Sequence, residues 1–219
     1  MSLPDAPSSD PERGPRSDHY FSPQPSVPSR RRIIHVTLPD TSFDLETDAG
    51  VFSHGRLDAG TKILLSEAPD LPADGTFLDL GCGAGPIAVT MALRRPKALI
   101  WAVDVNERAR DLTLGNARRL RVDSIRVSDP EDLLERLDSD RVTFDVIWSN
   151  PPIKIGKAAL HDLLATWLDR LSEDGWAALV VHKNLGSDSL AAWLGDRGWR
   201  VTRLASRQGY RVLRVDRAG

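Results

Sequence analysis

Short apolar segments alternate with amphipathic segments along most of the chain. Runs of apolar residues predict buried strands at 76–80, 98–104, 124–127, 144–149 and 176–182. Apolar residues at helical spacing fall between or after these strands, at 86–95, 107–120, 131–137, 160–171 and 187–195. Strands that alternate with helices predict a mainly parallel sheet with helices covering both of its faces.

Hairpin patterns stand at both ends of this alternating region. The last two predicted strands, 199–205 and 210–215, are close enough in sequence to form an antiparallel hairpin. Near the N-terminus, apolar and polar residues alternate on either side of Pro39-Asp40, a turn signal, and predict a β-hairpin at about 33–48. The expected fold is therefore α/β, a doubly wound, mainly parallel seven-stranded sheet with an antiparallel C-terminal hairpin, plus an N-terminal β-hairpin.

The first 29 residues differ from the rest in composition. They contain seven of the fifteen prolines together with several serines. Such a segment buries too little apolar surface to offset the entropy lost on ordering. We therefore expect residues 1–29 to form a disordered proline-rich tail, whose aromatic cluster His19-Tyr20-Phe21 can dock on the folded part, and residues 30–219 to form one domain.

The overall composition excludes several classes of protein. No apolar run reaches the roughly 20 residues that a membrane-spanning helix needs. The N-terminus lacks the basic and apolar regions of a secretory signal. A single cysteine, Cys82, excludes an internal disulfide and fits a reducing compartment. These features predict a cytoplasmic protein.

The charge of the chain is distributed unevenly. The formal net charge is −2, so bulk positive charge cannot drive nucleic-acid binding. Residues 150–219, however, hold 11 Lys and Arg residues against 7 Asp and Glu residues. This C-terminal part can meet phosphate groups, although solvated surface arginines explain the same count equally well.

A glycine-rich loop, D-L-G-C-G-A-G (79–85), follows the predicted strand 76–80 and precedes a helix. Its glycines permit a tight turn and the close approach of a ligand to the backbone. Asp104 ends the next strand, where a carboxylate can accept hydrogen bonds from both hydroxyls of a ribose. In a doubly wound sheet both features lie at the carboxyl ends of the strands, so they predict a nucleotide-type cofactor there.

The spacing of the glycines bears on which cofactor binds. Dinucleotide-binding loops usually read G-x-G-x-x-G, with a pyrophosphate at the helix N-terminus. The present G-C-G-A-G, preceded by Asp79, resembles instead the first motif of class I methyltransferases, which implies S-adenosylmethionine as the cofactor. Within this turn Cys82 is expected to be a small space-filling residue rather than a nucleophile.

A second motif, Asn150-Pro151-Pro152, follows the predicted strand 144–149. An exocyclic amine on a nucleobase is a poor nucleophile because its lone pair is delocalised into the ring. The Asn150 amide oxygen and the Pro151 carbonyl can each accept one N–H of such an amine and favour a pyramidal nitrogen. Prolines fix φ and so hold this carbonyl in place in advance. Catalysis would then consist of positioning and preorganised electrostatics. Taken alone the motif favours a simple turn that ends a strand, and its position in a sheet whose first loop binds the cofactor reverses this preference.

Taken together, these stretches resemble the small-subunit (16S) ribosomal RNA guanine-N2 methyltransferases and their single-domain relatives. The match rests on five segments: 19–22, 50–61, 79–85, 150–157 and 206–214. The resemblance implies methylation of guanine N2 in small-subunit ribosomal RNA, with RNA or the small subunit as the partner.

The resemblance also implies a set of site residues. Those expected on the methionine side of the cofactor are Phe52, Ser53, Asp58, Gly60 and Thr61. Those expected in the cofactor loop, at the ribose and near the adenine are Asp79, Gly81, Gly83, Gly85, Asp104, Asn106 and Asp129. The catalytic residues would be Asn150, Pro151 and Pro152.

Two departures from the family pattern concern the substrate. Longer members carry an additional N-terminal domain that helps to place the RNA, where this chain has only the tail and hairpin. Many base methyltransferases also have a stacking aromatic residue after the second proline, where this chain has Ile153. Stacking would then fall to Tyr20, Phe21 or Phe52. Besides Ile153, the expected substrate-binding residues are Lys154, Lys157, Arg207 and Arg211.

Several alternatives stay open at this point. The same Asn-Pro-Pro geometry suits adenine N6 or a protein glutamine amide. A dinucleotide-dependent oxidoreductase and a non-catalytic binding module are further possibilities. The histidines, including His161 and His182, show no metal-ligand spacing, so no metal is expected.

Overall fold

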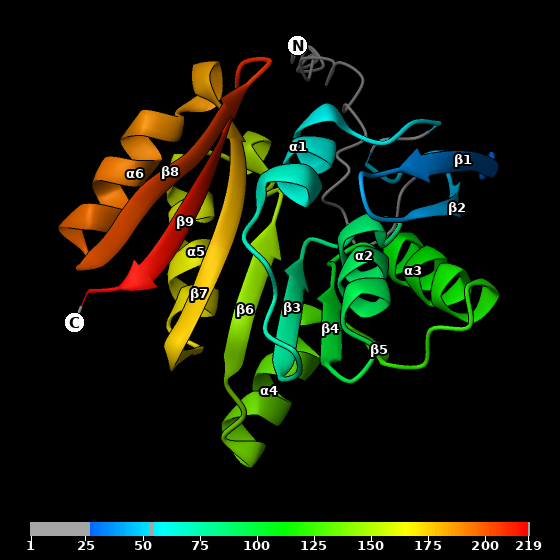
Figure 1. The fold of residues 1–219 in the computed structure, drawn as a ribbon, viewed down its shortest axis with the longest axis horizontal. Helices are drawn as coiled ribbons and strands as arrows, with labels where there is room; N and C mark the ends of the chain where they lie inside the picture. The colour runs from blue at the N-terminus through cyan, green and yellow to red at the C-terminus, as the bar shows by residue number, and fades with distance from the viewer. Residues whose placement is uncertain (1–26, 53–54, 219) are drawn as a thin grey trace, which may run out of the picture.

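A computed structural model of the chain describes residues 27–52 and 55–218. The expected α/β fold is confirmed. Seven strands form one sheet, and a separate two-stranded hairpin lies beside it (Figure 1). Within the described ranges, no helix is long and apolar enough to cross a membrane.

The seven-stranded sheet has the order β5-β4-β3-β6-β7-β9-β8. Its strands are β3 (Thr76–Leu80), β4 (Leu99–Val103), β5 (Ile125–Ser128), β6 (Phe144–Ser149), β7 (Leu171–His182), β8 (Trp199–Arg207) and β9 (Tyr210–Arg217). The first five are mutually parallel, and β9 pairs antiparallel with both β7 and β8. The chain runs outward from β3 in both directions, which places a topological switch point at this strand.

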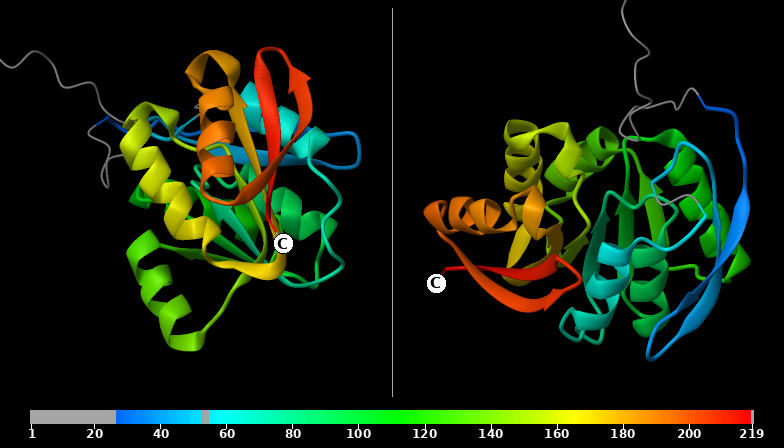
Figure 2. Two further views of the ribbon diagram at one scale, coloured as in Figure 1. Left: turned by 90° about the vertical axis from the view of Figure 1, so that its left-hand side faces the viewer. Right: turned by 90° about the horizontal axis from the view of Figure 1, so that it is seen from above.

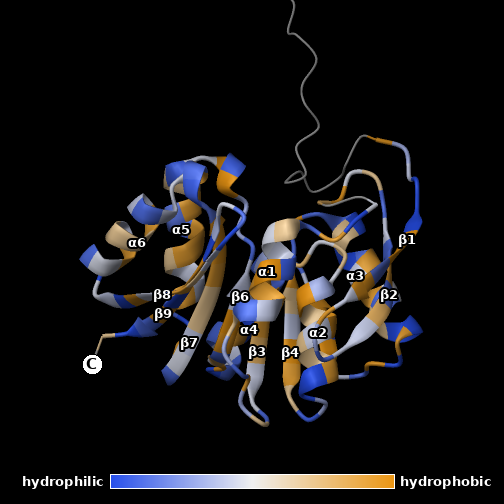
Figure 3. Ribbon diagram, turned by 45° about the horizontal axis from the view of Figure 1, so that its top comes forward, coloured by the Kyte–Doolittle hydropathy of each residue, from blue (hydrophilic) through white to orange (hydrophobic). Residues whose placement is uncertain are grey.

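In the described part of the chain, six α-helices cover the two faces of the sheet (Figure 2). They are α1 (Ala59–Glu67), α2 (Pro86–Arg94), α3 (Glu107–Arg119), α4 (Pro130–Asp140), α5 (Lys157–Leu168) and α6 (Ser187–Asp196). Residues of α1, α2 and α3 pack into one buried cluster with Phe77, and residues of α4, α5 and α6 pack into another with Leu78. Because neighbouring strand residues face opposite sides of the sheet, β3 is buried on both faces from Phe77 to Leu80. Figure 3 shows the helices mixing hydrophobic and hydrophilic residues, as amphipathic helices do.

The N-terminal hairpin consists of β1 (Arg32–Thr37) and β2 (Ser42–Thr47) and confirms the expected one. It is tied to the main domain through α3, where the Asn116 amide accepts from the backbone N–H of Glu46 (2.8 Å) and donates to its carbonyl (2.9 Å). Residues 1–26, most of the expected tail, and its aromatic cluster lie outside the described residues. The last tail residues are anchored, since Ser29 Oγ donates to Asp48 Oδ2 (2.6 Å).

The main difference from the predicted elements concerns the segment after β6. The helix expected at 160–171 begins at Lys157, after a short 3₁₀ turn at Ile153–Ile155, and it ends at Leu168. Gly156 has a φ of 96° and separates the two helices. Leu171 begins β7 instead, because it pairs with Phe144 of β6 before a register irregularity. The hydrophobic pattern of 160–171 therefore spans a helix end and a strand start.

The strand register aligns the ends of three central strands. Leu80, the last residue of β3, pairs with Val103 of β4 and with Ser149 of β6. The Ser149 hydroxyl also donates to the Leu80 carbonyl at 2.7 Å. The residues that follow these strands therefore emerge at one level along the same sheet edge.

Candidate active site

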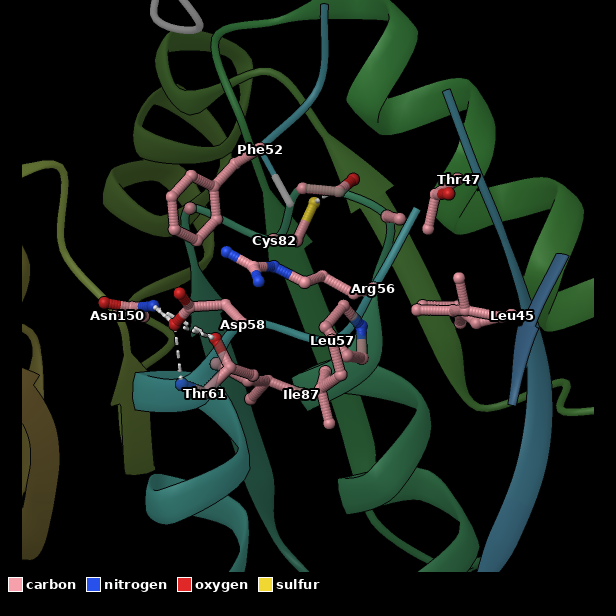
Figure 4. A pocket seen from close by; sticks show the side chains of 15 residues that line it. Leu45, Thr47, Phe52, Arg56, Leu57, Asp58, Thr61, Cys82, Ile87 and Asn150 are labelled. Atoms are coloured by element: carbon pink, nitrogen blue, oxygen red, sulfur yellow. Dashed lines mark hydrogen bonds between the residues drawn. The ribbon is translucent and has the colours of Figure 1, made fainter. Parts of the chain in front are cut away.

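A cavity of about 290 Å³ lies at this edge of the sheet. Gly81, Asp104 and Asn150, each the first residue after one of the three aligned strands, all line it. A smaller cavity adjoins it toward the hairpin and shares Phe52, Asp58, Gly81 and Asn150 (Figure 4). The sequence motifs far apart in the chain thus converge on one cleft.

The glycine loop between β3 and α2 forms the floor of this cleft. All three of its glycines have positive φ, a conformation that other residues adopt only with strain. At Gly81 (φ 80°) no atom lies within 4 Å of the position that a Cβ would occupy, so the cleft side of this residue is open. Gly85 begins α2 and Pro86 takes its first position, which proline suits because no N–H is needed there. The loop can therefore admit a ligand directly against the backbone.

Asp79 lies beneath the loop and does not line the cleft. Its side chain is fully buried, and Oδ2 accepts the backbone N–H of Ala88 in the first turn of α2 (2.9 Å). Burial, with a smaller contribution from the charge of Asp104, raises the pKa of Asp79 to about 8, against the opposing hydrogen bond from Ala88. Its Oδ1 has no hydrogen-bond partner in the described structure. The geometry assigns Asp79 to fixing α2 relative to β3.

Asp104 stands at the end of β4 with both carboxylate oxygens held by the backbone. Oδ2 accepts from Gly83 N (3.0 Å) and Oδ1 from Asn106 N (2.9 Å). Burial raises the pKa of Asp104, while these two N–H groups and the nearby Arg110 oppose the rise. Each oxygen keeps a further lone pair, so the fixed carboxylate can still accept from two hydroxyls.

Asn106 contributes to the site mainly through its backbone. Its side chain caps α3, accepting from the N–H groups of Arg108 and Ala109, and its amide nitrogen donates to the Gly50 carbonyl at 2.9 Å. Asn106 is buried and lines the cleft, but its side-chain amide is engaged in holding the segment after β2 against α3. Its backbone N–H donates to Asp104 Oδ1 and so orients that carboxylate.

Asn150 is held by two residues from the start of α1 (Figure 4). Its Nδ2 donates to Asp58 Oδ1 (2.8 Å) and to Thr61 Oγ1 (3.0 Å). Asp58 is also the N-cap of α1, accepting from the Thr61 N–H at 2.9 Å. Both amide hydrogens of Asn150 are used, which directs its Oδ1 away from Asp58, as Figure 4 shows. The side chain therefore presents a fixed acceptor.

The two prolines after Asn150 form a tight turn. Pro152 has φ −75° and ψ 73°, the values of an inverse γ-turn. The Pro151 carbonyl accepts the N–H of Ile153 at 2.8 Å within this turn. A carbonyl oxygen has two lone pairs, so one remains for another donor. Both prolines and Ile153 line the cleft.

Cys82 is buried, and burial raises the pKa of its thiol well above the ordinary value. Charges on Asp104 and Asp79 act in the same direction. The thiol packs against Thr113, whose hydroxyl lies 3.4 Å from the sulfur. A protonated, buried thiol is not a nucleophile, which agrees with a space-filling role.

The structure brings most of the predicted site residues together and leaves some apart. Those that line the two cavities are Phe52, Asp58, Thr61, Gly81, Gly83, Asp104, Asn106, Asn150, Pro151, Pro152, Ile153 and Lys154. Those that do not are Gly60, Asp79, Gly85, Asp129, Lys157, Arg207 and Arg211. Ser53 lies outside the described residues.

Three of the outlying residues are engaged elsewhere. Asp129 caps α4 by accepting from Glu131 N (2.9 Å) and pairs with Arg110, while its neighbour Pro130 reaches the cleft. Arg207 pairs with Glu67 at 3.1 Å. Arg211 pairs with Asp188. The adenine and phosphate contacts predicted for these side chains would compete with these pairings.

Two aromatic residues are among the cleft residues that the sequence reasoning missed. Tyr210, the first residue of β9, and His182, the last of β7, both line the larger cavity. Burial and the charge of Asp58 raise the pKa of Tyr210, and Arg56 opposes them. Tyr210 belongs to the segment 206–214 that carries part of the family resemblance, and this was the signal that could have located it.

A doubly wound sheet with this terminal hairpin, a glycine loop after β3, a carboxylate after β4 and Asn-Pro-Pro after β6 defines a class I S-adenosylmethionine-dependent methyltransferase. The family model called methyltransferase small domain matches residues 42–214. The chain belongs to that family.

The chain is similar to both uncharacterised and named relatives. It is 31% identical to the uncharacterized protein YbxB of Bacillus subtilis over 199 residues, covering 91% of this chain and 98% of YbxB. Ribosomal RNA small subunit methyltransferase C of Pseudoalteromonas translucida is 39% identical over 138 residues, 61% of this chain and 37% of the relative. Its counterpart from Pseudomonas entomophila is 31% identical, with 58% of the relative covered. The chain thus spans well under two thirds of both methyltransferase C relatives.

Among solved structures, the fold resembles the 16S rRNA N2 G1207 methyltransferase RsmC of T. thermophilus, determined with AdoMet and guanosine. The TM-score is 0.68 at 21% identity, covering 88% of this chain and 52% of the other. The ribosomal protein L11 methylase of Lactobacillus delbrueckii gives a TM-score of 0.58 at 20% identity, covering 75% of this chain and 85% of the other. These likenesses concern the fold.

The cleft fits S-adenosylmethionine, the cofactor of this class. The open side of Gly81 leaves room against the loop backbone, and the Asp104 carboxylate offers two acceptors for ribose hydroxyls. Val51, Val105 and Ala109 supply apolar surface beside that carboxylate. When bound, the cofactor supplies an electrophilic methyl group.

Proposed function

We propose that this protein transfers a methyl group from S-adenosylmethionine to an exocyclic amino group of a nucleobase, guanine N2 of small-subunit ribosomal RNA, in the cytoplasm. The orientation of Asn150 carries the proposal. Its two amide hydrogens are bound by Asp58 and Thr61, so its Oδ1 is a preset acceptor in the cleft.

The proposed chemistry overcomes the low nucleophilicity of an exocyclic amine. Its lone pair is delocalised into the purine ring, and accepting its two N–H groups favours the pyramidal nitrogen that can attack a methyl carbon. Asn150 Oδ1 can take one N–H, and the second lone pair of the Pro151 carbonyl can take the other. Because the γ-turn already fixes that carbonyl, little reorganisation is needed when the base arrives. The residues thus act by position and by fixed dipoles.

The choice of guanine in ribosomal RNA is supported by the relatives. Several bear the name ribosomal RNA small subunit methyltransferase C, and the RsmC structure is described as an N2 methyltransferase of 16S rRNA. Lys154 lies on the cleft rim, and Lys157 is exposed at the start of α5, where both can meet backbone phosphates.

Tritiated S-adenosylmethionine tests the proposal. The protein is incubated with small ribosomal subunits and with free ribosomal RNA from cells that lack the gene, and products are digested separately with nuclease and protease. We expect label in RNA that appears as N2-methylguanosine in a nucleoside digest. Label in N6-methyladenosine, or label that survives nuclease and is lost to protease, would contradict the guanine assignment.

Asn150→Ala supplies the matched variant. It should reduce turnover by at least about 100-fold, the scale of losing a preset transition-state contact. Affinity for S-adenosylhomocysteine should stay within about twofold, since Asn150 is assigned to the substrate. Wild-type protein with no turnover on any ribosomal particle or RNA would favour a binding module instead.

A further inference from the structure

An aromatic pair forms one wall of the cleft. Tyr210 of β9 and His182 of β7 are direct partners in the antiparallel register. Their ring centroids lie 4.9 Å apart with the ring planes at 88°, an edge-to-face contact. Both line the cavity together with Pro152 and Ile153. The two side chains therefore line the same cavity as the Asn-Pro-Pro turn.

Tyr210 sits beside the residues that hold Asn150. A Cβ on Gly60 would lie 2.7 Å from Tyr210 Cε1 and 3.0 Å from Asp58 Oδ1. The absence of a side chain at Gly60 thus lets the tyrosine ring approach the start of α1, next to the carboxylate that Asn150 contacts. This close approach is a packing reason for a glycine that the family resemblance placed at the cofactor.

His182 is the second neighbour of the Tyr210 ring. Its Nδ1 accepts the backbone N–H of Asn184 at 3.3 Å. Its Nε2 lies 2.7 Å from the point that a Cβ on Gly209 would occupy, so the tight turn before Tyr210 leaves space for the imidazole. The tyrosine ring therefore contacts Gly60 and His182 and is only partly buried, and its backbone belongs to a strand paired on both edges.

We propose that Tyr210 is the aromatic surface on which the substrate base stacks during methyl transfer, with His182 as the residue that positions its ring. This inference rests on the proposed function. It supplies the stacking partner that Ile153, after the second proline, cannot provide. Phe52, a further aromatic side chain in the cavity, is 45% exposed and lies on a loop, whereas the backbone of Tyr210 is fixed in the sheet.

Guanosine 5′-monophosphate serves as the probe, observed by proton NMR with protein saturated in S-adenosylhomocysteine. Stacking on an aromatic ring moves the guanine H8 signal upfield. We expect this shift with wild type and with Tyr210→Phe, and we expect Tyr210→Leu to weaken binding roughly 10- to 100-fold. With ribosomal RNA as substrate, Tyr210→Leu should raise KM by a similar factor and change kcat less.

A circular dichroism spectrum like that of the wild type shows that each variant is folded, and for the two Tyr210 variants an affinity for S-adenosylhomocysteine within about twofold of wild type shows that the cofactor site is intact. Phe52→Leu removes another aromatic side chain of the cavity, one that is also expected at the cofactor, so its affinity for S-adenosylhomocysteine is measured separately; at saturating S-adenosylhomocysteine it should retain the H8 shift. The inference is overturned if wild type gives no shift, if Tyr210→Leu keeps it, or if only Phe52→Leu loses it. Nucleotide binding is measured without turnover, so the two proposals can fail separately. If the wild-type enzyme is inactive but still gives the Tyr210-dependent shift, only the proposed reaction is refuted, and the stacking role of Tyr210 stands.

Discussion

The amide nitrogen of Asn150, at the end of β6, lies 2.8 Å from the carboxylate Oδ1 of Asp58, the N-cap of α1. The two residues are 92 positions apart in sequence. A carboxylate accepts hydrogen bonds only, so this contact sets which end of the Asn150 amide faces the cleft. The orientation of the Asn150 Oδ1 acceptor thus depends on Asp58, the residue that caps the N-terminus of α1.

Thr61→Val tests this dependence. Valine keeps the shape of threonine but removes Oγ1, which accepts from Asn150 at 3.0 Å. The freed amide should sample other orientations, and we expect the single-turnover rate to fall about 5- to 10-fold, the value of one such hydrogen bond. Thr61→Ser retains the acceptor and should stay close to the wild-type rate. Equal rates for the two variants would show that the contact does not orient Asn150.

Asp104→Ala should weaken cofactor binding. The variant removes two acceptors and also frees the N–H groups of Gly83 and Asn106, which now hold the loop. We expect affinity for S-adenosylhomocysteine to fall at least about 10-fold in calorimetry, on the scale of hydrogen bonds to a charged group. Wild type should show no tight binding of NAD in the same experiment. Tight NAD binding would instead indicate an oxidoreductase.

The stability of the ligand-free protein should fall as pH rises. Asp79 has a pKa of about 8 when folded and an ordinary value of 3.8, so between these values only the folded state holds the proton. Proton binding therefore stabilises the fold at low pH, and this contribution is lost by up to about 1.4 kcal/mol per pH unit toward pH 8.

Urea unfolding between pH 5 and 8 measures this slope. Asp79→Asn keeps the shape of the side chain and an acceptor for Ala88 N–H but does not titrate, so its free energy of unfolding should depend less on pH. The difference between the two proteins isolates Asp79 from other titrating groups. Parallel pH profiles would show that Asp79 ionises normally.

Two glycine substitutions should have opposite effects on stability. Gly81→Ala places a side chain at φ 80° and directs a methyl group into the cleft, so we expect about 1 kcal/mol of destabilisation and weaker cofactor binding. Gly115 lies within α3, is exposed and has no atom within 4 Å of its Cβ position. Gly115→Ala should therefore stabilise the protein by about 0.5–1 kcal/mol. Thermal unfolding compares them directly, and a stabilised Gly81→Ala would contradict the backbone assignment.

Much of the fold could be predicted because its signals are local. The strands of the parallel sheet are buried on both faces and so read as continuous apolar runs, with Phe77 and Leu78 entering opposite clusters. The predicted boundaries were wrong where one continuous apolar pattern covered the end of one element and the start of the next. Leu171 was predicted in a helix, but it begins β7 because it pairs with Phe144. No residue near Leu171 in sequence carries that information.

For the candidate site, too, some features could be predicted from the sequence and others could not. The residues after β3, β4 and β6 could be predicted to meet, because the carboxyl ends of parallel strands share one edge. Helix caps could not be told from ligand contacts, since Asp58 and Asp129 both cap helices yet only Asp58 reaches the cleft. An N-cap requires only a short polar side chain, whichever way the helix then points.

The sequence by itself determined the order of the elements, the glycine loop and the Asn-Pro-Pro turn, because these features depend on the backbone preferences and the apolar pattern of residues that are neighbours in the chain. Only the tertiary structure decided which side chains act on one another. It placed Asp58 against Asn150, left Asp79 beneath the loop, and put Tyr210 in the cleft through antiparallel pairing with His182. Such contacts depend on strand register and helix position, which arise from packing across the whole domain.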